Sequence, residues 1–130
     1  MAKRMDPNEQ SYHDRVVADL MHEYKYYPSG SRVIINPSSE HNKDINGYYP
    51  DVVCFDPSTN MTYVICEVET ENSVNEQETQ QWFKFAQLHT TFYLFVPDTC
   101  YSNALGLIKN HNIKAIVNPY HYTGGVLIVP

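Results

Sequence analysis

Cysteine is scarce in this 130-residue sequence, which has three copies and no CxxC pair. An odd number of cysteines without that spacing argues against a disulfide framework and against a zinc knuckle. Cys54 and Cys66 lie in apolar runs, where cysteine usually behaves as a small buried hydrophobe. We therefore expect both to belong to the core.

Long apolar runs are also missing. No run approaches the roughly 20 residues needed to cross a bilayer. The opening "MAKRMDPNEQ" lacks the apolar segment that is typical of a signal peptide. We expect a cytoplasmic protein with no membrane partner.

Positive charge is in the minority, with 9 Lys and Arg against 15 Asp and Glu and a net charge of −6. This balance argues against a basic protein that coats nucleic acid, although an acidic metal site remains compatible with a nucleic-acid enzyme. The six histidines show no HxxxH or HExxH spacing, so a zinc hydrolase has little support.

The residues that are present predict a single α/β domain over 1–130, of ordinary globular composition. The segment "YHDRVVADLMHEYKYY" carries its apolar residues on one helical face and ends before Pro28. Glu23 falls at the border of that face, so we expect its side chain to reach the edge of the core. Two strands, Tyr48 to Phe55 and Met61 to Glu69, flank "DPSTN" and predict an antiparallel hairpin covered on both sides.

The remaining elements are predicted from periodicity and turn signals. They are a strand at Arg32 to Asn36, a polar loop at Asn36 to Gly47, a helix from near Val74 behind the Ser73 and Glu76 capping box, a strand at Thr90 to Pro97, a helix around Tyr101 to Ile108, and short strands at Lys114 to Val117 and Val126 to Val129. We interpret "NPYHYTGG" between the last two strands as a structural loop, with base stacking by its aromatic residues as the alternative. The order predicts a mixed central sheet flanked by helices.

Three carboxylates fall at the open end of the predicted hairpin. Glu67 and Glu69 share a strand face because side chains alternate with period two. Asp51 and Glu67 are an even number of residues apart, so a turn centred on Thr59 places them opposite each other. The same register pairs Val53 with Ile65, and Phe55 with Tyr63.

Opposed like charges near a core need a compensating cation. Mg²⁺ or Mn²⁺, which prefer hard oxygen ligands, would supply it. The alternative is that these acids are solvated strand ends.

The helix, the hairpin with Pro50-Asp51 and Glu67-Val68-Glu69, and the helix and strand that follow resemble the PD-(D/E)xK nuclease superfamily. The resemblance covers about residues 12–97. It implies a restriction-endonuclease-like αβββαβ core, followed here by an extra helix and short strands. Matched to the family's motif, the metal ligands are Glu23, Asp51, Glu67 and the main-chain carbonyl of Val68.

This sequence departs from the family at the usual lysine, which corresponds to Glu69. A minority of restriction enzymes also carry ExE, so Glu69 is expected to be an extra ligand or the general base. Lys84, on the next helix, is predicted to face outward, whereas Gln81 lies at the rim of the apolar arc as an accessory candidate.

The resemblance thus implies a metal-dependent endonuclease that hydrolyses phosphodiester bonds in DNA, with Asp51, Glu67 and Glu69 as catalytic residues. It suggests a homodimer, and we expect the DNA path near Lys25 and Lys43. Two alternatives stay open: a catalytically inactive nuclease-like domain that binds nucleic acid or protein, and an unrelated α/β interaction domain.

Overall fold

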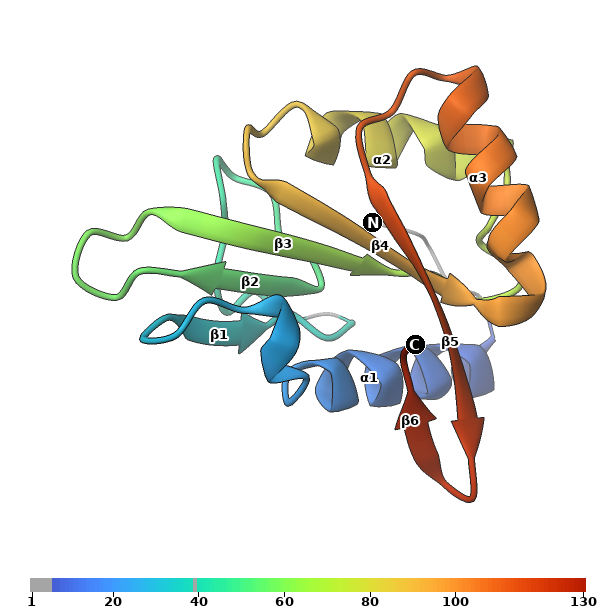
Figure 1. The fold of residues 1–130 in the computed structure, drawn as a ribbon, viewed down its shortest axis with the longest axis horizontal. Helices are drawn as coiled ribbons and strands as arrows, with labels where there is room; N and C mark the ends of the chain where they lie inside the picture. Colours follow the sequence, from blue (N-terminus) through green and yellow to red (C-terminus); the bar gives the residue numbers. More distant parts are fainter. Residues whose placement is uncertain (1–5, 39) are drawn as a thin grey trace.

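The computed structural model describes residues 6–38 and 40–130 and contains three α-helices and a six-stranded mixed sheet (Figure 1). The predicted order of helices and strands is confirmed. In chain order the elements are α1 (Pro7–Leu20), the 3-10 turn Tyr24–Tyr26, β1 (Arg32–Ile35), β2 (Val52–Phe55), β3 (Thr62–Val68), the 3-10 turn Glu76–Glu78, α2 (Thr79–Ala86), β4 (Thr91–Pro97), the 3-10 turn Asp98–Cys100, α3 (Tyr101–Asn110), β5 (Ile116–Thr123) and β6 (Val126–Ile128).

The six strands lie in the sheet in the order in which they occur in the chain. β3, β4 and β5 run parallel to one another, and the remaining neighbours are antiparallel. The parallel connections pass through α2 and α3, as parallel strands require a crossover. The strands β2, β3 and β4 in the middle are buried on both faces.

Helices cover the two faces of the sheet unequally. α1 packs on one face through Val16, Val17 and Leu20, whereas α2 and α3 pack on the other (Figure 1). Alternate residues of β3 serve the two layers, with Cys66 facing α1 and Ile65 facing α2. Both cysteines of the hairpin are buried and free, as the apolar runs predict.

The hairpin of β2 and β3 keeps the predicted register over most of its length. Val53 pairs with Ile65, as expected. The pairing of Phe55 with Tyr63 is wrong, because a bulge beside Phe55 shifts its partner to Thr62. The shift lies at the closed end of the hairpin, so the alignment of the open end is preserved.

Several element boundaries differ from the sequence-based expectation, and the strand predicted from Tyr48 begins only at Val52. The first helix begins at Pro7, with Asp6 capping its N-terminus through the backbone N–H of Asn8, and ends at Leu20. α2 begins at Thr79 rather than near Val74, because the intervening residues form a 3-10 turn capped by Asn75.

The stretch "NPYHYTGG" is mostly strand, so its interpretation as a loop is wrong. β5 runs from Ile116 to Thr123, and Gly124 and Gly125, both at positive φ, form the turn into β6. Pro119 is tolerated because β6 pairs only with the last residues of β5, from His121 onward.

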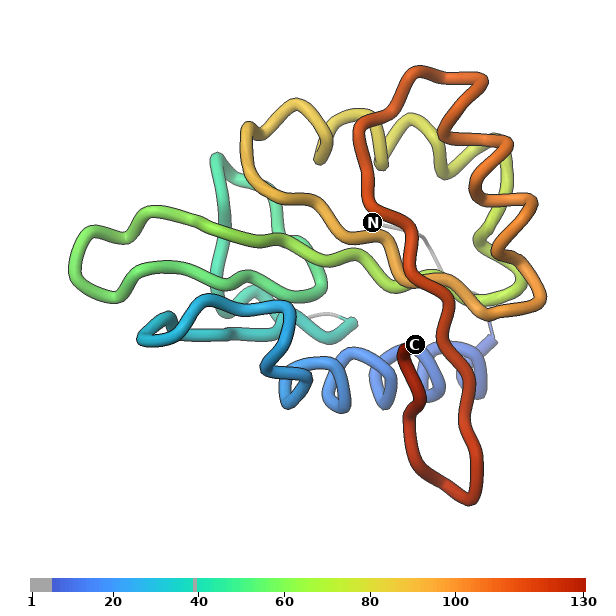
Figure 2. The backbone as a smooth tube through the Cα atoms, in the orientation of Figure 1, coloured from blue at the N-terminus to red at the C-terminus, as the bar shows by residue number. Residues whose placement is uncertain are grey.

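The β5–β6 hairpin extends beyond the rest of the sheet and lies against α1 (Figure 2). Arg15 donates from Nη2 to the Gly125 carbonyl over 2.9 Å, and the Tyr122 hydroxyl donates to Asp19 Oδ2 over 2.7 Å. Lys25, just after α1, donates to the carbonyl of Val129 over 2.8 Å. These contacts join residues that are more than a hundred positions apart.

Candidate functional site

The open end of the β2–β3 hairpin brings Asp51 and Glu67 together, as the even spacing predicts. Asp51 directly precedes β2, and its backbone N–H donates to Glu67 Oε2 over 2.8 Å. In turn, the backbone N–H of Val68 donates to Asp51 Oδ2 over 2.8 Å. The two carboxylates are therefore tied to the ends of both strands, and each is only 1% exposed.

Burial dominates the electrostatics of Glu67. Loss of solvent raises the pKa of this carboxyl well above its usual value, and the nearby charges of Asp51 and Glu69 raise it further. A buried carboxyl in these surroundings favours the neutral form unless a cation compensates it. Burial and the neighbouring charges thus make the ionised form of Glu67 unfavourable at this end of the sheet.

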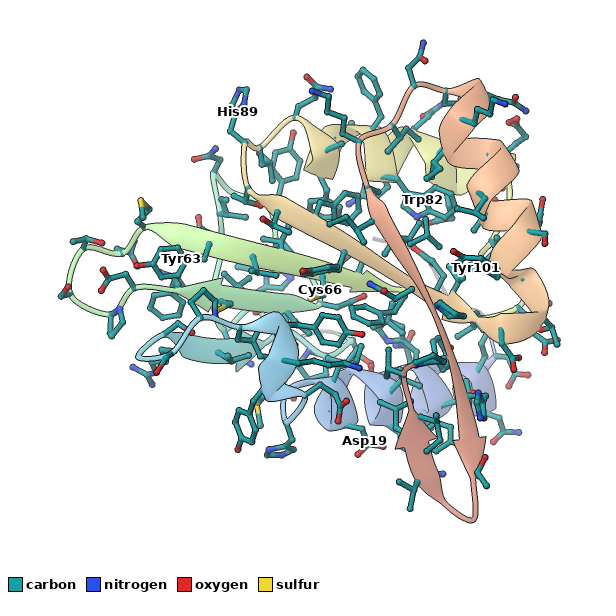
Figure 3. The ribbon with its side chains drawn as sticks, in the orientation of Figure 1. Asp19, Tyr63, Cys66, Trp82, His89 and Tyr101 are labelled. Atoms are coloured by element: carbon teal, nitrogen blue, oxygen red, sulfur yellow. The ribbon has the colours of Figure 1, made fainter. Side chains whose placement is uncertain are left out.

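Glu69 lies just beyond β3 and is fully buried. The indole N–H of Trp82, on α2, donates to Glu69 Oε2 over 2.8 Å. The main chain of Glu69 is held as well, since its N–H donates to the Phe95 carbonyl and its carbonyl accepts from the Tyr120 hydroxyl. Trp82 lies between the helices and the sheet (Figure 3), which orients Glu69 from the α2 side.

The residue of the first helix that reaches Asp51 is His13. Its ring is fully buried, with Nε2 3.1 Å from Asp51 Oδ2 and Nδ1 2.9 Å from Asp14 Oδ1. Ser38 Oγ donates to Asp14 Oδ2, and Gln10 donates to Asp14 Oδ1 over 3.2 Å. Although partial burial opposes it, the hydrogen bonds from Ser38 and His13 hold the pKa of Asp14 below its usual value.

The expectation that Glu23 belongs to the first helix is wrong. α1 ends at Leu20, and Glu23 precedes the 3-10 turn that follows, where it is half-buried. Its charge acts on Tyr26 and Tyr27, whose pKa values are raised first by burial and also by Glu23. The structure therefore places Glu23 with this tyrosine pair rather than on the helix that contacts Asp51.

The basic and accessory candidates are distributed over several elements. Lys25 contacts the Val129 carbonyl and lies over the ring of Tyr26. Lys43 is half-buried, with its ammonium group on Asn60 Oδ1 and 4.3 Å from the ring centroid of Phe55.

The two candidates on α2 lie close together in the chain. Gln81 is half-buried, one residue before Trp82, which is consistent with a position at the rim of the apolar arc. Lys84 is exposed, which confirms that it faces outward.

The donor set at the hairpin fits a hard divalent cation. Asp51 Oδ1 is buried and has no hydrogen-bond partner, so this oxygen is suited to a cation. Across residues 6–38 and 40–130, no three His, Cys, Asp or Glu side chains converge as ligands of one metal ion. Mg²⁺, however, commonly takes one or two protein carboxylates and completes its shell with water and substrate phosphate. Asp51 and Glu67 supply such a pair.

A cleft of about 330 Å³ lies between the start of α1 and the residues that follow β3. Two of its lining residues, Tyr12 and Thr70, are chain neighbours of His13 and Glu69. The other lining residues are Asp6, Asn8, Glu9, Glu71 and Pro97. Asp51, Glu67 and Glu69 are not among its lining residues, and each is at most 1% exposed.

Comparison with known proteins adds no relative. No protein-family model, curated protein or solved structure matches this chain. Among the helices in the described part of the chain, none is long and apolar enough to span a membrane.

Two residues of the site, His13 and Trp82, are not among the candidates from the sequence. His13 precedes Val16, Val17 and Leu20 at helical spacing, and this signal places it on the buried face of α1. The contact of Trp82 with Glu69 depends on how α2 docks on the sheet, for which the sequence carries no local signal.

Proposed function

We propose that this chain is a metal-dependent phosphodiester hydrolase that acts on DNA. The observation that carries the proposal is the buried pair formed by Asp51 and Glu67, in which Asp51 Oδ1 has no hydrogen-bond partner. Two carboxylates held face to face without solvent are unfavourable unless a cation or a proton compensates them. A divalent cation bound between the two carboxylates would compensate their negative charge.

Each carboxylate has a separate role in the proposal. Asp51 Oδ1 and Glu67 would hold Mg²⁺ or Mn²⁺, with the main-chain carbonyl of Val68 as the further ligand that the resemblance implies. When bound, the metal ion polarises the phosphate and lowers the pKa of a bound water. Glu69, oriented by the indole of Trp82, would accept the proton of the attacking water or act as an additional ligand.

The arrangement of elements supports a restriction-endonuclease-like core. α1 is followed by three antiparallel strands, a helix and a parallel strand, which is the αβββαβ order that the resemblance implies. In this proposal, α3 and the β5–β6 hairpin are additions to the core. A homodimer and cytoplasmic location remain predictions from the resemblance and the composition.

A second candidate is a nuclease-like domain that has lost catalysis and binds nucleic acid or protein. It is favoured by the complete burial of Glu69, by its hydrogen bond to Trp82 and by the missing lysine. In this case the carboxylates would stabilise the end of the sheet as a hydrogen-bonded network, with a proton on Glu67 instead of a metal ion.

A cleavage assay tests the first candidate against the second. The protein is incubated with linear, nicked and branched DNA in Mg²⁺ or Mn²⁺, beside Asp51→Ala and a matched control, Asp56→Ala, at the closed end of the same hairpin. We expect Asp51→Ala to reduce cleavage by more than about 100-fold, the upper end of the effect of residues that only support a ligand. We expect Asp56→Ala to retain it.

Binding separates the outcomes further. Cleavage that persists in Asp51→Ala would contradict the site assignment, and the absence of Mn²⁺ binding in calorimetry would contradict the enzyme. DNA binding without cleavage or metal binding would support the second candidate.

A further inference from the structure

The two oxygens of the Asp51 carboxylate have different surroundings. Oδ2 accepts the backbone N–H of Val68 over 2.8 Å and lies 3.1 Å from His13 Nε2. Oδ1 has no hydrogen-bond partner. The contacts on Oδ2 prevent the carboxylate from rotating and so keep the orientation of Oδ1 constant.

The His13 ring is in turn fixed from its other side. Nδ1 lies 2.9 Å from Asp14 Oδ1, and Asp14 itself accepts hydrogen bonds from Ser38 and Gln10. A buried ring between two carboxylates has little freedom to turn, because rotation would break both contacts. The chain of contacts thus runs from the loop at Ser38, through α1, to Asp51.

We propose that His13 is the positioning residue of the candidate metal site: it holds Asp51 Oδ2 so that Oδ1 stays directed toward the cation. This inference rests on the proposed function. It gives α1 a role different from the one expected of Glu23, since the helix contributes a support for the ligand rather than a ligand. Residues that orient metal ligands through hydrogen bonds typically change metal affinity about 10- to 100-fold when replaced.

A direct role of His13 as a metal ligand makes a different prediction. As a ligand, His13 would coordinate the metal ion through a ring nitrogen. The amide nitrogen of asparagine or glutamine cannot take that place, because it only donates hydrogen bonds. A positioning residue needs only an N–H that reaches Asp51. Amide side chains of two lengths can therefore distinguish the two roles.

The test compares His13→Gln with His13→Asn. The amide nitrogen of glutamine takes the place of Nε2 and keeps the contact with Asp51, whereas that of asparagine takes the place of Nδ1 and keeps only the contact with Asp14. We expect His13→Asn to weaken Mn²⁺ binding about 10- to 100-fold and His13→Gln to weaken it much less. Binding of Mn²⁺ is measured by calorimetry without nucleic acid, with the exposed His22→Gln as the matched control.

Each result has one consequence. Equal affinity in His13→Asn and the unmodified protein overturns the inference but leaves the proposed function intact, as does an equal loss in both variants. Failure of the unmodified protein to bind Mn²⁺ overturns the proposed function and this inference together. Thermal unfolding without metal accompanies each titration, because a purely structural role would lower the midpoints of both variants without changing the Mn²⁺ affinity of the folded protein.

Discussion

The two ends of the β2–β3 hairpin carry the same kind of side chain in opposite surroundings. At the closed end, Asp56 accepts hydrogen bonds from the hydroxyl and the backbone N–H of Ser58, which hold its pKa below the usual value. At the open end, burial and neighbouring charges raise the pKa of Glu67. One hairpin thus has a carboxylate that is stable as an anion and another that is not.

The difference shows which acids of this chain need a functional explanation. Asp56 forms a turn and its charge is solvated, so its presence is explained by the local backbone. Asp51 and Glu67 also accept backbone N–H groups, but they are removed from water and face each other, and a cation would offset that cost in the proposed function. The closed end therefore serves as a reference for each measurement at the open end.

Removal of the Trp82 side chain should give the largest difference between the two ends. We expect Trp82→Ala to lower the free energy of unfolding by about 3–5 kcal/mol, because it leaves a cavity and removes the donor to Glu69. Met61→Ala, at the exposed closed end, should change it by about 0.5 kcal/mol or less. Urea unfolding measures both, and similar losses would contradict a tightly packed open end.

Asp51→Ala should have the next largest effect on the metal-free protein. It removes the acceptor of the Val68 N–H and the partner of His13, at about 1–3 kcal/mol for each buried group left unsatisfied. Asp56→Ala should lower the free energy of unfolding much less, because Ser58 can bond to water instead. Equal losses in urea unfolding would show that the open end is also solvated.

The pH dependence of stability should have opposite signs at the two ends. Folded Glu67 keeps its proton to a higher pH than the unfolded chain, so its contribution is complete below the usual pKa of 4.5 and is lost as pH rises toward the raised folded pKa. For Glu67, the free energy of unfolding changes by at most about 1.4 kcal/mol per pH unit. Folded Asp56 has a lowered pKa, so its contribution is present above the usual 3.8 and is lost as pH falls.

Glu67→Gln and Asp56→Asn isolate these two contributions. Urea unfolding in a metal chelator is repeated across the acid range for the unmodified protein and both variants. The advantage of Glu67→Gln over the unmodified protein should grow as pH rises, whereas the deficit of Asp56→Asn should shrink as pH falls. An advantage of Glu67→Gln that is independent of pH would mean that Glu67 is not perturbed by burial.

The smallest expected effect concerns the backbone of the closed end. Asn60 has a φ of 65°, in the left-handed region, so Asn60→Ala should cost about 1 kcal/mol and Asn60→Gly much less. Both variants lose the contact with Lys43, so the difference between them isolates the backbone term. Equal stabilities in urea unfolding would show that the turn relaxes.

The alignment of Asp51 with Glu67 could be predicted because it depends only on strand alternation and on the parity of the hairpin. The bulge at Phe55 changes the pairing on the far side of that alignment and leaves it intact. Local rules of this kind transfer directly from sequence to structure.

The residue that α1 brings to Asp51 could not be predicted from such local rules. The periodic segment alone predicts Glu23 on the first helix, but the start signals at Asp6 and Pro7 place the whole helix earlier in the chain. His13 carries a usable signal in its spacing to Val16 and Leu20. Its contact with Asp51, like that of Trp82 with Glu69, depends on how the layers dock, which no short stretch of sequence specifies.

The hydrogen bonds between α1 and the β5–β6 hairpin have a consequence for the order of folding. Arg15 and Asp19 bind partners made more than a hundred residues later, at Gly125 and Tyr122. During synthesis on the ribosome, α1 therefore waits for most of the chain before these contacts can form, and contacts of such long sequence separation form slowly. The contact of His13 with Asp51 spans only 38 positions, so the helix can reach the carboxylates well before its partners in β5 and β6 are made.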